Sequence, residues 1–104
     1  MQERIAQLQE FLAREPEDDF LRHALAMEYL GTGATDKARM LFEAVLKKNP
    51  AYVPSYYQLG KLLEQEGDAE AALAVFEKGM AAAKAAGEQR AYNELQSAYE
   101  ELAY

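Results

Sequence analysis

The chain has 104 residues, half of them hydrophobic, and a formal net charge of −7, which suits one soluble domain with a modest core. The negative charge argues against nucleic acid, which attracts clustered lysine and arginine, and no apolar run is long enough to span a bilayer. The absence of cysteine excludes disulfides and cysteine-based zinc sites.

The first residues, MQERIAQLQE, carry polar and acidic side chains where a signal peptide needs an apolar stretch, which favours a cytoplasmic protein. Beyond them, apolar residues recur every three or four positions along most of the chain, as in helices with one buried face. Prolines and glycines interrupt this pattern. We therefore predict six helices and no strand, with the helices near residues 2–15, 18–31, 35–48, 53–66, 69–86 and 89–103.

The apolar stripes themselves repeat with a fixed period of about 34 residues, a length typical of stacked supersecondary units. Identical residues recur at this separation in the pairs Leu25 and Leu59, Gly33 and Gly67, Ala38 and Ala72, and Phe42 and Phe76. The period indicates helical hairpins, none of which can bury its apolar face alone. The two glycines are expected to turn the chain, and Asp68 can cap the helix after the second turn.

Helix pairs with this period resemble the tetratricopeptide repeat (TPR) family. Residues 53–86 carry the residues of its motif, namely Tyr56 as the opening aromatic, Leu59-Gly60 as the Leu-Gly pair, and Ala72 and Phe76 in the second helix. Residues 19–52 are similar, except that Arg22 replaces the opening aromatic. The resemblance implies an all-α fold, a right-handed α-solenoid of antiparallel helix pairs with two full repeats and a half repeat at each end.

This resemblance also implies the domain organisation. We expect one domain over residues 1–104, with an N-terminal half-repeat helix (1–18), two repeats (19–52 and 53–86) and a C-terminal capping helix (87–104). Phe42 and Phe76 are expected to fill the wedge between hairpins.

The sequence offers no chemistry of an enzyme, and we expect no catalytic residue, metal or cofactor. The stretch GTGATDK (31–37) lacks the Gly-Lys-Ser or Gly-Lys-Thr end of a phosphate loop, so a plain turn is the better interpretation. His23 has no second histidine, cysteine or HExxH frame near it in the sequence. The carboxylates around Gly67 lie on polar faces, where solvated charge explains them.

Two adjacent tyrosines suggest a binding surface. Successive helical residues point about 100° apart, so Tyr57 faces away from the core stripe of Tyr56, beside Lys61 and Glu64. We expect the Tyr57 ring to be exposed, to contribute little to the core and to offer rigid contact area to a partner. The resemblance implies that the first helices of successive repeats line a concave groove. The predicted site consists of His23, Met27, Leu30, Tyr57, Gln58, Lys61, Glu64, Asn93 and Glu100.

We predict a non-catalytic scaffold that binds a peptide or partner helix in this groove. The partner is expected to be a protein or peptide with an apolar anchor against His23 and Met27 and a basic residue beside Glu100, and not nucleic acid or membrane. The Lys, Asn and Arg clamp for C-terminal carboxylates, found in one subtype of the family, is not matched. The alternative is self-assembly into a homodimer through exposed terminal helices, because residues 1–18 resemble a second helix with no first helix before it.

Overall fold

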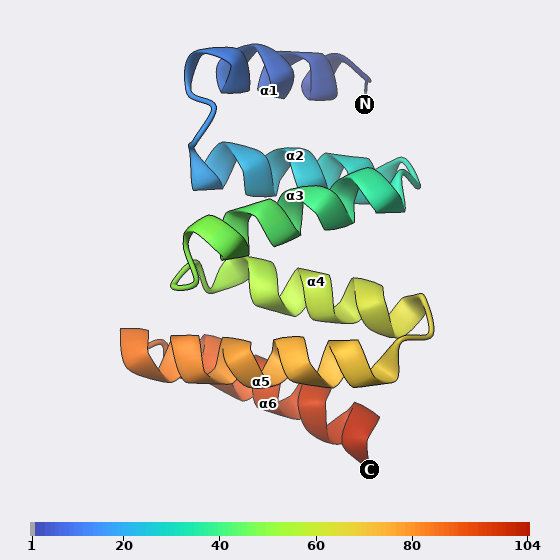
Figure 1. Cartoon of the computed structure of the whole chain (residues 1–104), viewed down its shortest axis with the longest axis vertical. Coiled ribbons are helices and arrows are strands. Elements are labelled where there is room, and N and C mark those ends of the chain that lie inside the picture. Colours follow the sequence, from blue (N-terminus) through green and yellow to red (C-terminus); the bar gives the residue numbers. More distant parts are fainter. Residues whose placement is uncertain (1) are drawn as a thin grey trace. The chain divides into compact units, whose positions relative to one another are not determined.

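The computed structural model describes residues 2–104, which form six α-helices joined by short turns (Figure 1). The helices are α1 (Gln2–Arg14), α2 (Asp19–Gly31), α3 (Thr35–Lys48), α4 (Pro54–Gln65), α5 (Ala69–Ala86) and α6 (Gln89–Ala103). No strand occurs within residues 2–104. The predicted helix ends differ from these bounds by no more than one residue, which confirms the prediction from periodicity and breakers.

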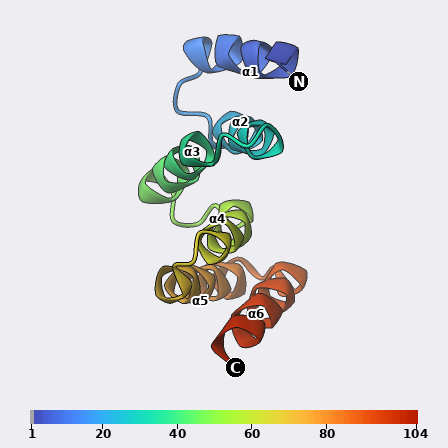
Figure 2. The ribbon, with the colours of Figure 1, turned by 90° about the vertical axis from the view of Figure 1, so that its right-hand side faces the viewer.

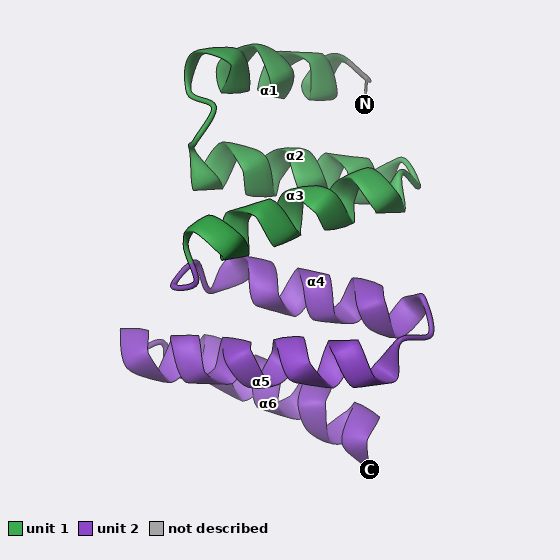
Figure 3. Cartoon of the chain, in the orientation of Figure 1, with its two compact units in different colours: residues 1–49 green, residues 50–104 purple. Residues whose placement is uncertain are grey.

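The chain divides into two compact units, residues 1–49 with α1 to α3 and residues 50–104 with α4 to α6 (Figure 3). In unit 1, α2 packs against α3, and α1 packs against α2. In unit 2, α5 packs against both α4 and α6, as Figure 2 shows. The single domain of four segments that the sequence suggests stays a prediction.

Caps and glycine turns set the ends of several helices. Asp18 caps α2 by accepting a hydrogen bond from the Leu21 amide at 2.9 Å, and Asp68 caps α5 through the Ala71 amide at 3.1 Å. Gly33 and Gly67 adopt φ values of 81° and 86°, the left-handed region that favours glycine. The predicted roles of Asp68 and of both glycines are therefore confirmed.

The core of unit 2 depends on two glycines that let helices approach closely. A Cβ at Gly60 of α4 would overlap the ring of the buried Phe76 of α5. A Cβ at Gly79 of α5 would lie 2.6 Å from the Cβ of Tyr56 and 3.1 Å from Cδ1 of Leu95 on α6. Gly60 was singled out in the sequence, but Gly79 was not.

The two repeat phenylalanines pack inside their own hairpins. Phe42 of α3 lies against the ring of His23 on α2, and Phe76 lies against Gly60 and Tyr57 on α4. The wedge expected for them between hairpins is thus not where these contacts are made. The short residues of the first helix, Ala26 and Gly60, leave room for the rings within each pair.

Arg22 makes the same hydrogen bond as the aromatic residue that it replaces. Its Nε donates to the carbonyl oxygen of Pro16 at 3.0 Å, and the Tyr56 hydroxyl donates to that of Pro50 at 2.6 Å. The two donors are separated by one repeat period, and so are the two prolines. The departure from the motif at Arg22 therefore preserves this link between a first helix and the segment before it.

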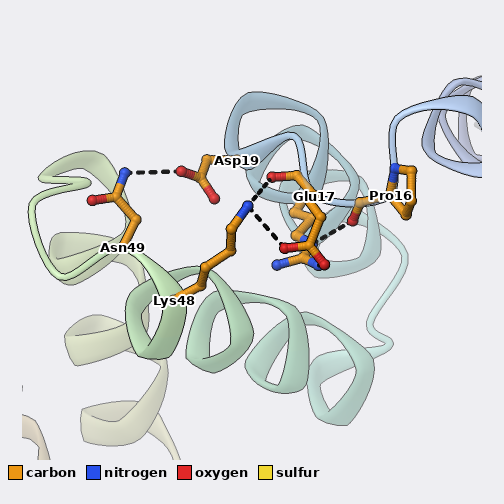
Figure 4. Close-up of polar contacts among 6 residues, drawn as sticks. Pro16, Glu17, Asp19, Lys48 and Asn49 are labelled. Carbon is orange, nitrogen blue, oxygen red and sulfur yellow. Dashed lines mark hydrogen bonds and ion pairs between the residues drawn. The ribbon is translucent and has the colours of Figure 1, made fainter.

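The end of α3 is tied to the segment between α1 and α2 (Figure 4). Lys48 Nζ donates to the carbonyl oxygen of Glu17 at 2.8 Å and pairs with its carboxylate at 2.9 Å, and Asn49 Nδ2 donates to Asp19 Oδ2 at 2.8 Å. The hydrogen bond and charge of Lys48, together with the charge of Arg22, lower the pKa of Glu17 from its usual value. Lys48 is thus engaged within unit 1.

Candidate protein-binding faces

One side of α2 presents the predicted residues His23, Met27 and Leu30, because steps of three and four residues return to the same face of a helix. Met27 is 37% exposed, while His23 and Leu30 are half-buried. The His23 ring centroid lies 5.4 Å from that of Phe42, at an interplanar angle of 59°. Burial lowers the pKa of His23 from 6.5, so this ring is uncharged at neutral pH and the side of α2 is apolar.

Phe20 extends this apolar side and was missed in the sequence. Its side chain is 68% exposed, three residues before His23 and about 60° from it around the helix. The spacing of Phe20, His23 and Met27 was visible in the sequence, but large apolar residues at helical spacing usually belong to the core. We call Phe20, His23, Met27 and Leu30 the α2 face.

Tyr57 on α4 is half-buried, and its ring centroid lies 6.4 Å from that of Phe76. The expectation of an exposed ring that contributes little to the core was wrong, because a tyrosine ring reaches far enough to lie against the neighbouring helix. His23 and Tyr57 lie one repeat period apart, as do Phe42 and Phe76. Each unit therefore has the same arrangement, a half-exposed ring of the first helix supported by a buried phenylalanine of the second.

The other predicted residues of α4 form a polar neighbourhood around Tyr57. Lys61 Nζ pairs with Glu64 Oε1 at 3.2 Å, and both side chains are half-buried, as is Gln58. The pair largely cancels the positive charge that Lys61 would otherwise show to a ligand. The α4 residues therefore offer a ring and mixed polar groups with little net charge.

On α6, the predicted residues Asn93 and Glu100 are exposed and lie two turns apart on one side of the helix. Asn93 Oδ1 accepts a hydrogen bond from Gln89 Nε2 at 2.9 Å. Because α4 and α6 contact each other, these residues belong to the same unit as Tyr57 and Lys61. The α2 face belongs to unit 1 and stands by itself.

Other kinds of site have little support in the described part of the chain. Among residues 2–104, no group of three or more histidine, cysteine, aspartate or glutamate side chains is placed to hold a metal ion. No helix in that same range is long and apolar enough to cross a membrane. The stretch GTGATDK spans the end of α2, a turn and the start of α3, which confirms the interpretation as a plain turn between helices.

Known proteins share this arrangement. Residues 29–99 match the sequence profile of the tetratricopeptide repeat. A TPR repeat-containing protein of Pseudomonas aeruginosa, PA0015, is 29% identical over 88 residues, which cover 85% of this chain and 84% of that protein.

Two solved structures are similar over most of their length. A tetratricopeptide repeat domain protein from Salinibacter ruber is 38% identical, with a TM-score of 0.81 and coverage of 84% of this chain and 88% of that one. Protein BPP2914 from Bordetella parapertussis is 32% identical, with a TM-score of 0.81 and coverage of 95% and 86%. These matches confirm the predicted fold class, an all-α solenoid of helix pairs.

Proposed function

Because the chain belongs to the tetratricopeptide repeat family, we propose that it binds a peptide or partner helix through the outward sides of its first helices. Proteins of this family bind protein partners and are in general non-catalytic scaffolds. The contact surfaces are the α2 face in unit 1, and Tyr57, Gln58, Lys61 and Glu64 of α4 with Asn93 and Glu100 of α6 in unit 2.

The observation that carries this proposal is the supported ring in each unit. His23 rests on Phe42, and Tyr57 rests on Phe76, so each ring is held before a ligand arrives. A rigid aromatic group loses little conformational freedom on binding, and aromatic residues dominate the energetics of many interfaces. Phe20 and Met27 add exposed apolar area beside His23.

The partner's chemistry follows from the character of these surfaces. The α2 face favours an apolar anchor, whereas Glu100 and its neighbours Glu94 and Glu101 favour lysine or arginine. Arg90 pairs with Glu94 at 3.7 Å and offsets one of these charges. Exposed ion pairs contribute only ~0.2–1 kcal/mol each, so the apolar anchor carries more of the affinity and the charges select the ligand.

A peptide array with variation in apolar and charged positions tests this proposal. Phe20→Ala and Met27→Ala should each weaken the preferred peptides by about 1 kcal/mol or more, since both side chains are exposed and their loss leaves the core intact. Met40→Ala, an equally mild change at an exposed methionine of α3, is the matched control. A preference for acidic peptides, or equal losses in all three variants, would contradict the proposal.

Self-assembly through terminal helices is the second candidate, and exposed Phe11 on α1 favours it. Phe11 is 49% exposed, although its neighbours Gln7, Glu10 and Arg14 give the outward side of α1 a polar character. Sedimentation of the intact chain over a range of concentrations decides between them. A dimer that Phe11→Ala dissociates supports this candidate, and a monomer at high micromolar concentration rules it out.

A further inference from the structure

The outer surface of α3 carries a second exposed apolar site. Met40 is 67% exposed, and it borders a cavity of about 380 Å³ in unit 1. The cavity is lined by Leu25 and Tyr29 of α2 and by Lys37, Met40, Leu41 and Ala44 of α3. We call these six residues, together with Lys47 one turn further along α3, the α3 surface.

This surface lies on a different side of α2 from the α2 face. Leu25 and Tyr29 each follow a residue of the α2 face, His23 or Met27, by two positions. Two helical steps turn the chain by about 200°, so the cavity opens away from the α2 face. A ligand at one surface leaves the other accessible.

Charge distinguishes α3 from every other helix between residues 2 and 104. It carries four basic side chains and two acidic ones, whereas each other helix is neutral or negative. The basic residues are Lys37, Arg39, Lys47 and Lys48, and the acidic ones are Asp36 and Glu43. This chain of net charge −7 therefore has one helix with a positive outer side.

Two of the basic groups are available for a ligand. Arg39 pairs with Asp36 at 3.9 Å, and Lys48 is held by Glu17. None of the ion pairs found among residues 2–104 includes Lys37 or Lys47, which lie within about 60° of Met40 around the helix. Lys37 Nζ lies 5.4 Å from the centroid of the Tyr29 ring, which sets its ammonium at the wall of the cavity.

The repeat itself does not require this arrangement. At the equivalent positions of α5, one repeat period further along, the chain has Ala71 for Lys37, Ala74 for Met40 and Lys78 for Ala44. Unit 2 thus forms the same helical hairpin without a large apolar side chain at this place. The exposed methionine between lysines is a feature of unit 1 that packing of the hairpin leaves unexplained.

We propose that the α3 surface binds an acidic amphipathic peptide, which places an apolar side chain in the cavity and carboxylates beside Lys37 and Lys47. Charge complementarity identifies the occupant, because the positive side of α3 would repel the basic ligand proposed for the other surface. The apolar contacts of Met40, Leu41 and Leu25 supply affinity, and the two lysines set the charge preference.

The test uses two labelled helical peptides with the intact chain, one with leucine on one face flanked by glutamate, the other with lysine in place of glutamate. Fluorescence anisotropy should show binding of the glutamate peptide to the parent chain. Lys37→Glu with Lys47→Glu should weaken it roughly tenfold or more, because two exposed attractions become repulsions. Met40→Ala should weaken it severalfold.

The control is Lys78→Glu with Lys84→Glu, which makes the same change of charge at exposed lysines of α5. It should leave most of the affinity, and Phe20→Ala should have no effect, which separates this site from the α2 face. Helical content and thermal unfolding should be unchanged, because every altered side chain is exposed.

Three results would overturn the proposal. They are the absence of binding by the glutamate peptide, a stronger response to the lysine peptide, and equal losses in the two double variants. A peptide-free dimer that Met40→Ala dissociates would instead assign the α3 surface to a second copy of the chain.

Discussion

Tyr56 and Tyr57 are neighbours in the sequence and have different surroundings in the fold. Tyr56 is buried, its hydroxyl donates to Pro50, and burial raises its pKa. Tyr57 is half-buried against Phe76. The direction of each ring could be predicted from the 100° step between residues, but its contacts could not, because they depend on a second helix.

Tyr56→Phe should lower the free energy of unfolding by about 1 kcal/mol, since it removes one hydrogen bond and keeps the ring. Chemical denaturation checks this value. Tyr57→Phe is the control and should change little, because its ring contacts Phe76. Equal losses in the two variants would show that the bond to Pro50 has no special weight.

His23 should make stability depend on pH just below neutrality. Burial lowers its pKa from 6.5, so the unfolded chain takes up a proton at higher pH than the folded chain does. The free energy of unfolding should therefore fall as pH drops from 6.5 towards the folded-state pKa, and stay level above 6.5 as far as this residue is concerned.

Because His23 is the only histidine, His23→Phe should flatten the curve in that window. Denaturation at several pH values between neutrality and the range where carboxylates titrate provides the measurement. A slope that survives in the variant would assign the effect to other groups.

At the scale of the element, α5 is the centre of unit 2, with α4 on one side and α6 on another. Gly60 and Gly79 allow these close approaches. The Leu-Gly pair of the repeat motif pointed to Gly60. Gly79 takes the place of Val45 in the other repeat, and identity at that position could not be expected from the period.

Gly79→Ala tests whether packing outweighs helix propensity at this position. Alanine favours helix over glycine by about 1 kcal/mol, whereas overpacking costs about 1–3 kcal/mol. The new Cβ would lie 2.6 Å from that of Tyr56, so we expect net destabilisation. Ala81→Gly, at an exposed site of α5, calibrates propensity in the same helix. A more stable Gly79→Ala variant in thermal unfolding would contradict the packing argument.

At the scale of the whole molecule, apolar exposure and charge are unevenly distributed along the chain. Residues 1–49 have seven basic and nine acidic side chains, and residues 50–104 have four and nine. Apart from Tyr104, the exposed large apolar side chains of residues 2–104 all belong to unit 1, namely Phe11, Phe20, Met27 and Met40. Unit 1 is thus suited to apolar contact and unit 2 to attraction of basic groups.

Helices, turns and repeat could be predicted because they follow from local signals such as glycines, prolines and apolar spacing. The binding surfaces were predicted only in part. His23 and Met27 followed from the repeat, whereas Phe20 and Met40 looked like core residues. Their exposure depends on which helices cover them, and no periodicity within one helix contains that information.

The most direct test of the central claim, ligand binding by the α2 face, is NMR of the chain labelled at its methionine methyl groups. The sequence has four methionines, of which Met27 lies on the α2 face, Met40 on the α3 surface and Met80 on α5. Titration with the peptide of leucine flanked by lysine should shift the Met27 signal, and Phe20→Ala should weaken that response, while Met40 and Met80 stay unchanged. A titration that shifts Met40 but leaves Met27 in place, or moves none of the signals, would contradict the account.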